Sequence, residues 1–220
     1  LFGVYYRAAL YEDAVRIAER ASTYDDPHGI DARYNAALAL TRLGRYEEAL
    51  AKLRTSRPSR KTPGDVAFQI AVVKVAMAKF AQARLILDEL VKEKYAEAST
   101  LRAFLPALEG AAHELAVLPD TAPPEHRARL VSMLGRHVEA ARAWSEVVRS
   151  PSASEALLAE ALLYLVQSGD RGAIEAASQA LTRKQGKLSP ELAAMVELRL
   201  DELERLVRAR ERWSAHIVAP

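Results

Sequence analysis

An octapeptide that occurs twice constrains the fold of this chain more than any other feature of its sequence. The first copy spans residues 43–50 (LGRYEEAL), and the second spans residues 134–141 (LGRHVEAA). Weaker copies of the same pattern lie near residues 11, 79 and 169. A unit that recurs along a chain is typical of proteins built from stacked repeats, in which each unit packs only against its neighbours.

The spacing of the copies gives the length of the repeating unit. We align them on the aromatic residue of the pattern or on its equivalent, which are Tyr11, Tyr46, Phe80, His137 and Arg171. The successive steps are 35, 34, 57 and 34 residues, so three of the four fit a period near 34. The step of 57 exceeds one period by 23 residues, which predicts a short or irregular unit between Phe80 and His137.

Each regular unit is predicted to contain two helices. Over residues 31–53, apolar side chains recur at three- and four-residue spacing both before and after Gly44, as they do on one face of a helix. Glycine adopts the left-handed conformation at a helix end more easily than any other residue. Glu47 and Glu48 then fall in a first helical turn, where the helix dipole favours negative charge. The unit is therefore predicted to be a helical hairpin that turns at Gly44.

This pattern resembles the tetratricopeptide repeat. Two helices in about 34 residues, with Leu-Gly-x-Tyr-x-x-Ala at the turn, are typical of that family. The second unit matches best, through Ala37, Leu40, Leu43, Gly44, Tyr46, Ala49, Leu50 and Leu53. The resemblance covers roughly residues 1–185. It implies an all-α fold, an α-solenoid of stacked antiparallel helix pairs that forms a superhelix with a C-terminal capping helix.

We accordingly predict a single helical array over residues 1–220. Its predicted parts are regular repeats over 1–93, an irregular or degenerate repeat over 94–120, regular repeats over 121–186 and a C-terminal capping helix over 187–220. A proline in a helix interior costs about 3 kcal/mol, so Pro106 is expected near the start of a second, short helix. The irregular part is either a joint where the superhelix changes pitch or a decayed repeat with no role.

The C-terminal helix, predicted over residues 190–213, is amphipathic. One face carries Val196, Leu200, Leu203 and Val207. The end of a solenoid exposes an apolar face and needs a covering element, so the helix is predicted to be a cap. The alternative is a homodimer or partner contact made through this helix, with Leu203, Leu206, Val207 and Trp213 in the interface.

The inner surface of the array is the candidate binding site. Between Val66 and Ala78 only Gln69 and Lys74 are polar, and a helix that is apolar all round is expected to be buried all round. In the tetratricopeptide family the first helix of each pair lines the concave face. The candidate peptide-binding residues there are Tyr34, Asn35, Leu38, Arg42, Phe68, Gln69, Val72 and Val75. Either a partner's helix or extended peptide occupies this groove, or the chain's own packing fills it.

The resemblance implies a non-catalytic scaffold that binds a protein or peptide partner. The alternative is a regulatory or sensor arm of a larger enzyme or signalling protein. We expect no catalytic residues, metal or cofactor, because the sequence has no cysteine, no HExxH or GxSxG motif and no Gly-rich phosphate loop. The five histidines have no metal-ligand spacing.

Charge and hydropathy give no indication of a nucleic-acid or membrane partner, and nucleic-acid binding through the basic residues Lys52 to Lys61 is the least favoured alternative. The 31 basic residues nearly balance the 29 acidic ones, so there is no general attraction to nucleic acid. The densest basic run, Lys52 to Lys61, is interpreted as a solvated helix end and loop. No segment approaches the ~18 apolar residues of a membrane span. We expect a cytoplasmic location and, because the chain begins at Leu1 inside a predicted helix, additional residues before it.

Overall fold

A computed structural model of the chain describes residues 2–22, 27–56, 63–183 and 189–217. All regular elements in these ranges are α-helices, which confirms the predicted all-α class. In chain order they are α1 (Phe2–Arg7), α2 (Tyr11–Ala21), α3 (Pro27–Arg42), α4 (Tyr46–Thr55), α5 (Pro63–Ala76), α6 (Phe80–Lys92), α7 (Ala96–Val117), α8 (Pro124–Met133), α9 (His137–Arg149), α10 (Glu155–Ser168), α11 (Arg171–Arg183) and α12 (Pro190–Ile217). Each helix packs against the next one along the chain.

The turn inside each helix pair has a shared conformation. The residue two positions before the second helix has a positive φ, between 56° and 78°, in all five pairs: Ala9, Gly44, Ala78, Gly135 and Gly169. In four of the five turns, the next residue donates its N–H to the carbonyl five residues earlier, as Arg45 does to Leu40 at 2.9 Å. These positions repeat at the spacing found in the sequence. The sequence period is therefore the period of this turn.

A single long helix accounts for the irregular step of 57 residues. The turn before α7 has the same conformation, with Lys94 at a φ of 60° and the N–H of Tyr95 donating to the carbonyl of Leu90 at 2.9 Å. Helix α7 is 22 residues long, and no turn of this conformation joins it to α8. The surplus residues are thus one unpaired helix and not a shortened helical hairpin.

The expectation of a helix start near Pro106 is wrong, because Pro106 lies inside α7. Proline removes one helical N–H, which leaves the carbonyl of Arg102 without its usual partner. Pro106 and its neighbours Phe104 and Ala107 are exposed, so water can reach this side of the helix. On the opposite side, the buried Leu105 and Leu108 belong to the core and keep the helix continuous.

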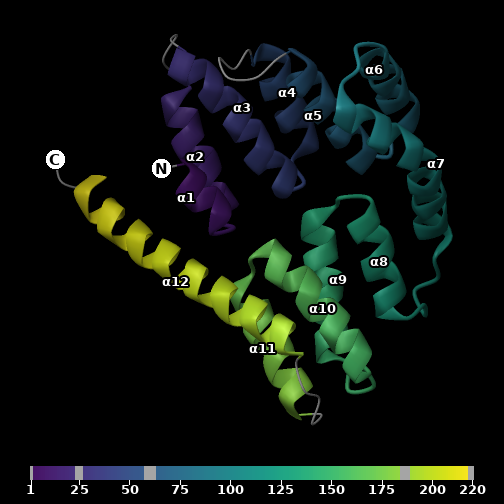
Figure 1. Ribbon diagram of the computed structural model, residues 1–220, viewed down its shortest axis with the longest axis vertical. Coiled ribbons are helices and arrows are strands. Elements are labelled where there is room, and N and C mark those ends of the chain that lie inside the picture. Colours follow the sequence, from purple (N-terminus) through teal and green to yellow (C-terminus); the bar gives the residue numbers. More distant parts are fainter. Residues whose placement is uncertain (1, 23–26, 57–62, 184–188, 218–220) are drawn as a thin grey trace.

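The unpaired helix divides the others into two arms, α1–α6 and α8–α11 (Figure 1). Each helix reverses the chain direction, so one extra helix moves the turns of the second arm to the opposite end. The turns of the two arms consequently face each other. One cross-arm contact is the Nε of Arg136 donating to the carbonyl of Ala76 at 3.0 Å.

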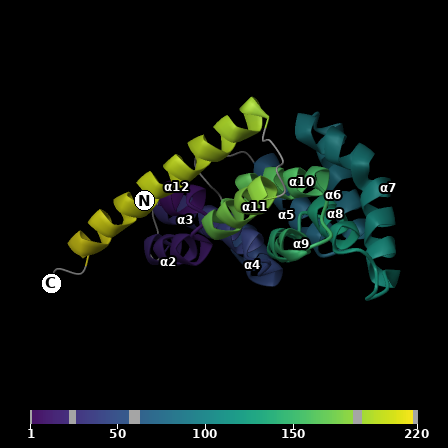
Figure 2. The same cartoon turned by 90° about the horizontal axis from the view of Figure 1, so that it is seen from below.

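Helix α12 joins the arms on the side away from α7 (Figure 2). It contacts α10 and α11 of the second arm and α1 of the first. Its Leu192, Val196 and Leu203 are buried in the core of the second arm, together with Trp144. Arg199 of α12 donates to the carbonyls of Val166 at 3.2 Å and of Arg7 at 3.0 Å. The first and last helices of the chain are therefore held together.

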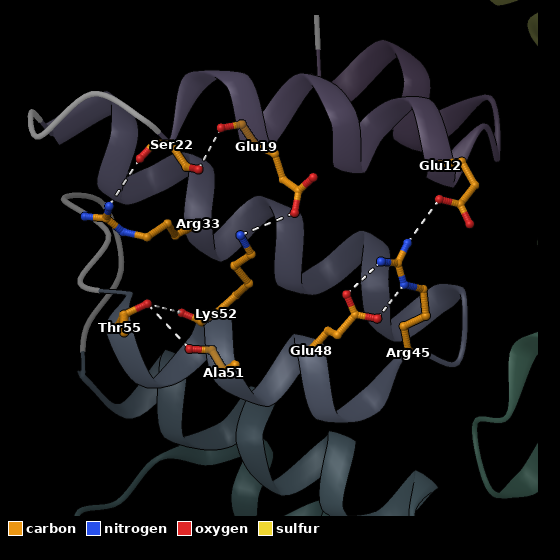
Figure 3. Close-up of polar contacts among 9 residues, drawn as sticks. All are labelled: Glu12, Glu19, Ser22, Arg33, Arg45, Glu48, Ala51, Lys52 and Thr55. Atoms are coloured by element: carbon orange, nitrogen blue, oxygen red, sulfur yellow. Dashed lines mark hydrogen bonds and ion pairs between the residues drawn. The ribbon is translucent and has the colours of Figure 1, made fainter.

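Polar contacts join the second helices of the first two pairs, α2 and α4, within the first arm (Figure 3). Arg45 pairs with Glu48 at 2.7 Å and with Glu12 of α2 at 3.2 Å. Lys52, the first residue of the basic run, pairs with Glu19 of α2 at 3.3 Å. The part of the run over residues 57–61 lies outside the described residues.

Candidate functional site

The eight candidate peptide-binding residues lie on α3 and α5, and neighbouring helices cover much of their surface. Tyr34 and Val75 are buried, with 6% and 5% of their surfaces exposed. The other six are partly buried, namely Asn35, Leu38, Arg42, Phe68, Gln69 and Val72. The ring of Phe68 packs against that of Tyr95, with centroids 5.5 Å apart. Tyr95, the residue before α7, thus covers part of Phe68, which was predicted from the sequence to contact a partner.

A cavity of about 620 Å³ lies where the two arms meet. Its walls come from the α1–α2 and α10–α11 turns, from one side of α9 beginning at His137, from the end of α3 and from α12. Arg42, at the end of α3, is the one candidate residue that lines it. The cavity is thus formed by turns and helix ends, with both arms contributing.

Arg42 reaches across the cavity wall from the first arm to the second. Its Nε donates to the hydroxyl of Tyr6 at 3.0 Å, and its guanidinium carbon lies 6.0 Å from the centre of that ring. Its Nη1 lies 3.2 Å from Nδ1 and 2.9 Å from Nε2 of His137. A guanidinium can only donate, so a ring nitrogen of His137 must accept. Tyr6 therefore fixes the direction in which Arg42 approaches the second arm.

His137 is held neutral by this environment. Burial of the imidazole and then the nearby charge of Arg42 lower its pKa from 6.5 to about 4. A neutral imidazole accepts the hydrogen bond that Arg42 offers, whereas an imidazolium would repel it. The residue stands where the repeat pattern has an aromatic, and it packs at the first turn of α9.

The lowered pKa predicts a specific loss of stability in acid. The unfolded chain takes up a proton on His137 near pH 6.5, whereas the folded chain resists it until about pH 4. This contribution to stability is complete above pH 6.5 and is lost as the pH falls through about 4. Urea unfolding at pH 7 and pH 5 should therefore show a smaller acid-induced loss in His137→Phe than in the wild type. An equal loss in both proteins would contradict this account, and His113→Phe, at an exposed site on α7, is the control.

Four arginines and one acid line the cavity: Arg42, Arg142, Arg149, Arg171 and Asp170. Arg171 pairs with Glu175 at 2.8 Å, and Asp170 accepts the N–H of Ala173 at 3.0 Å, which caps α11. Arg142 and Arg149 are exposed, and neither side chain has a hydrogen bond or ion pair with another described residue. The cavity thus presents two uncommitted guanidinium groups.

Apart from Arg42, sequence reasoning missed these charged lining residues. The available signal was weak: Arg142, Ser145 and Arg149 recur at positions i, i+3 and i+7 of α9, on one face of that helix. A polar face of this kind is normally a solvated surface. Only the packing of the second arm against the first, which the sequence does not show, identifies this face of α9 as part of a cavity wall.

Two absences concern only the described parts of the chain. There, no group of three or more histidine, aspartate or glutamate side chains is placed to hold a metal ion. The helices within these same ranges include none with the length and hydropathy needed to cross a membrane. Comparisons with protein-family models, with curated proteins and with solved structures found no match.

Proposed function

We propose that this chain is a tetratricopeptide-like scaffold that binds a segment of a partner protein without catalysis. The five turns at repeat spacing and the consecutive packing of helix pairs support the likeness. The binding site that we propose is the cavity between the arms, which replaces the apolar inner surface of α3 and α5 as the leading candidate.

One observation carries this proposal. The cavity of about 620 Å³ is bordered by Arg142 and Arg149, whose side chains form no hydrogen bond or ion pair with another described residue. By contrast, Tyr34, Phe68 and Val75 on the inner helices are occupied by contacts within the chain. A cavity of several hundred cubic ångströms with a few convergent polar groups is the usual form of a binding site.

Filling the cavity tests the proposal. Ser145 lines it from α9, and Ser145→Trp places a large side chain there. Ser99→Trp makes the same exchange at an exposed position on α7, outside the cavity. Immobilised wild-type protein and both variants are incubated with cell extract, and the retained proteins are quantified by mass spectrometry. We expect Ser145→Trp to lose proteins that the other two retain. Identical retention by all three, with unchanged circular dichroism, would contradict the proposal.

A further inference from the structure

The arginine-lined cavity has a net positive charge. Its lining contains four arginines and a single acid, Asp170, so three positive charges remain among the lining residues. Glu175, which is not in the lining, pairs with Arg171 and leaves about two of them uncompensated. Glu146 lies one turn from both Arg142 and Arg149 on α9, but it forms no ion pair with either of these described residues. A ligand with two negative charges therefore matches the positive charge of the lining better than a ligand with one.

Helix ends at this cavity contribute partial charges of both signs. Helices α2, α9 and α11 begin at Tyr11, His137 and Arg171, and all three residues line the cavity. The N-terminus of a helix carries a partial positive charge and N–H groups without helical partners. No side chain caps α2 or α9. The C-terminal ends of α1, α3 and α10 lie at the same place, where Ala8, Arg42 and Ser168 line the cavity, so the partial charges of the helix ends largely cancel. The arginine side chains therefore supply the net positive charge of the cavity.

The arginines of the cavity differ in the contacts that their side chains make within the chain. Arg42 is oriented by Tyr6 and contacts neutral His137, so it adds a directed positive charge that no carboxylate neutralises. Arg142 and Arg149 stand two helical turns apart on α9, with Ser145 between them. Guanidinium groups match planar arrays of oxygen atoms and form paired hydrogen bonds with them. The free pair is therefore available to a ligand that has several acceptor oxygens.

We propose that this cavity binds a phosphate monoester group, with Arg142 and Arg149 as its main ligands and Arg42 as an oriented third charge. A phosphate monoester carries close to two negative charges at neutral pH and offers three strong acceptor oxygens. A carboxylate carries one charge and would leave the site positive. The proposal rests on the proposed function and specifies its ligand: the phosphate belongs to a phosphorylated side chain of the partner segment.

Binding is measured by calorimetry on the full chain, with inorganic phosphate and N-acetylphosphoserine as probes. Chloride at the same ionic strength, N-acetylserine and N-acetylglutamate are the comparison ligands. We expect saturable binding of both phosphate probes that is stronger at pH 8 than at pH 5, because the second phosphate proton dissociates near pH 6. Phosphate binding without binding of phosphoserine would assign the site to a free anion and overturn the partner assignment.

The variant that tests the site is Arg142→Gln/Arg149→Gln. We expect it to weaken phosphoserine binding at least about tenfold, which corresponds to about 1.4 kcal/mol. Arg54→Gln/Arg183→Gln removes the same charge from exposed arginines outside the cavity and should leave the affinity unchanged. Equal affinities in the two double variants would overturn the proposal, and so would binding of N-acetylglutamate as tight as that of phosphoserine. If phosphate fails to bind while Ser145→Trp still loses its partners, the phosphate assignment alone is wrong.

Discussion

Leu162→Ala is expected to lower the free energy of unfolding by about 3 kcal/mol, within the range of buried leucine truncations. Leu162 is fully buried in α10, in the core that α8, α9, α11 and α12 share. Removing its methyl groups leaves a cavity that rigid neighbours cannot fill completely. The free energy of unfolding is measured by urea denaturation followed by circular dichroism.

The adjacent residue provides a matched control. Leu163 is next to Leu162 in the same helix, but 41% of its surface is exposed. Leu163→Ala should cost less than about 1 kcal/mol, because most surface substitutions have small effects. Similar losses at both positions would show that α10 does not face the second arm's core as described.

The second large effect is expected at Gly169, where the two arms come close together. Its φ is 78°, and a Cβ added there would lie 2.6 Å from Nη2 of Arg199 and 3.0 Å from the Cβ of Ala9. The left-handed conformation costs a residue with a Cβ about 1 kcal/mol. The crowding should add about 1–2 kcal/mol, as overpacking does elsewhere. Gly169→Ala is therefore expected to destabilise the protein by about 2–3 kcal/mol.

The same substitution at Gly135 distinguishes the cost of the left-handed backbone from the cost of crowding. Gly135 occupies the equivalent turn with a φ of 68°, but nothing lies within 4 Å of an added Cβ. Gly135→Ala should therefore show only the backbone cost of about 1 kcal/mol. If thermal or urea unfolding gives equal losses for the two variants, Gly169 does not approach Ala9 and the arms are farther apart than described.

Local sequence patterns predicted the parts of the fold that depend on neighbours in the chain. The turn at Gly44 and the helices on either side of it follow from apolar spacing and backbone preference over about 20 residues. The same reasoning failed at Pro106, because the local cost of a proline depends on whether its side of the helix faces water. Exposure at that position is a property of the packed molecule.

The candidate site was less predictable because its residues are far apart in the sequence. Arg42 and His137 are separated by 95 positions, and Arg199 and Arg7 by 192. Such pairs leave no periodic pattern in a single sequence. The step of 57 residues did locate the unpaired helix, but the sequence could not show that this helix turns one arm toward the other.

The meeting of the arms around the cavity is the claim on which both proposals depend, and a cysteine pair tests it most directly. The chain has no cysteine of its own, so only introduced thiols can react. In Ala9→Cys/Gly169→Cys the two Cβ atoms fall within reach of a disulfide after a small adjustment. Gentle oxidation of the folded monomer should give a cross-linked chain that migrates faster on a non-reducing gel, whereas Ala9→Cys/Gly135→Cys should not cross-link. A folded Ala9→Cys/Gly169→Cys monomer that keeps two free thiols under the same conditions would contradict the account.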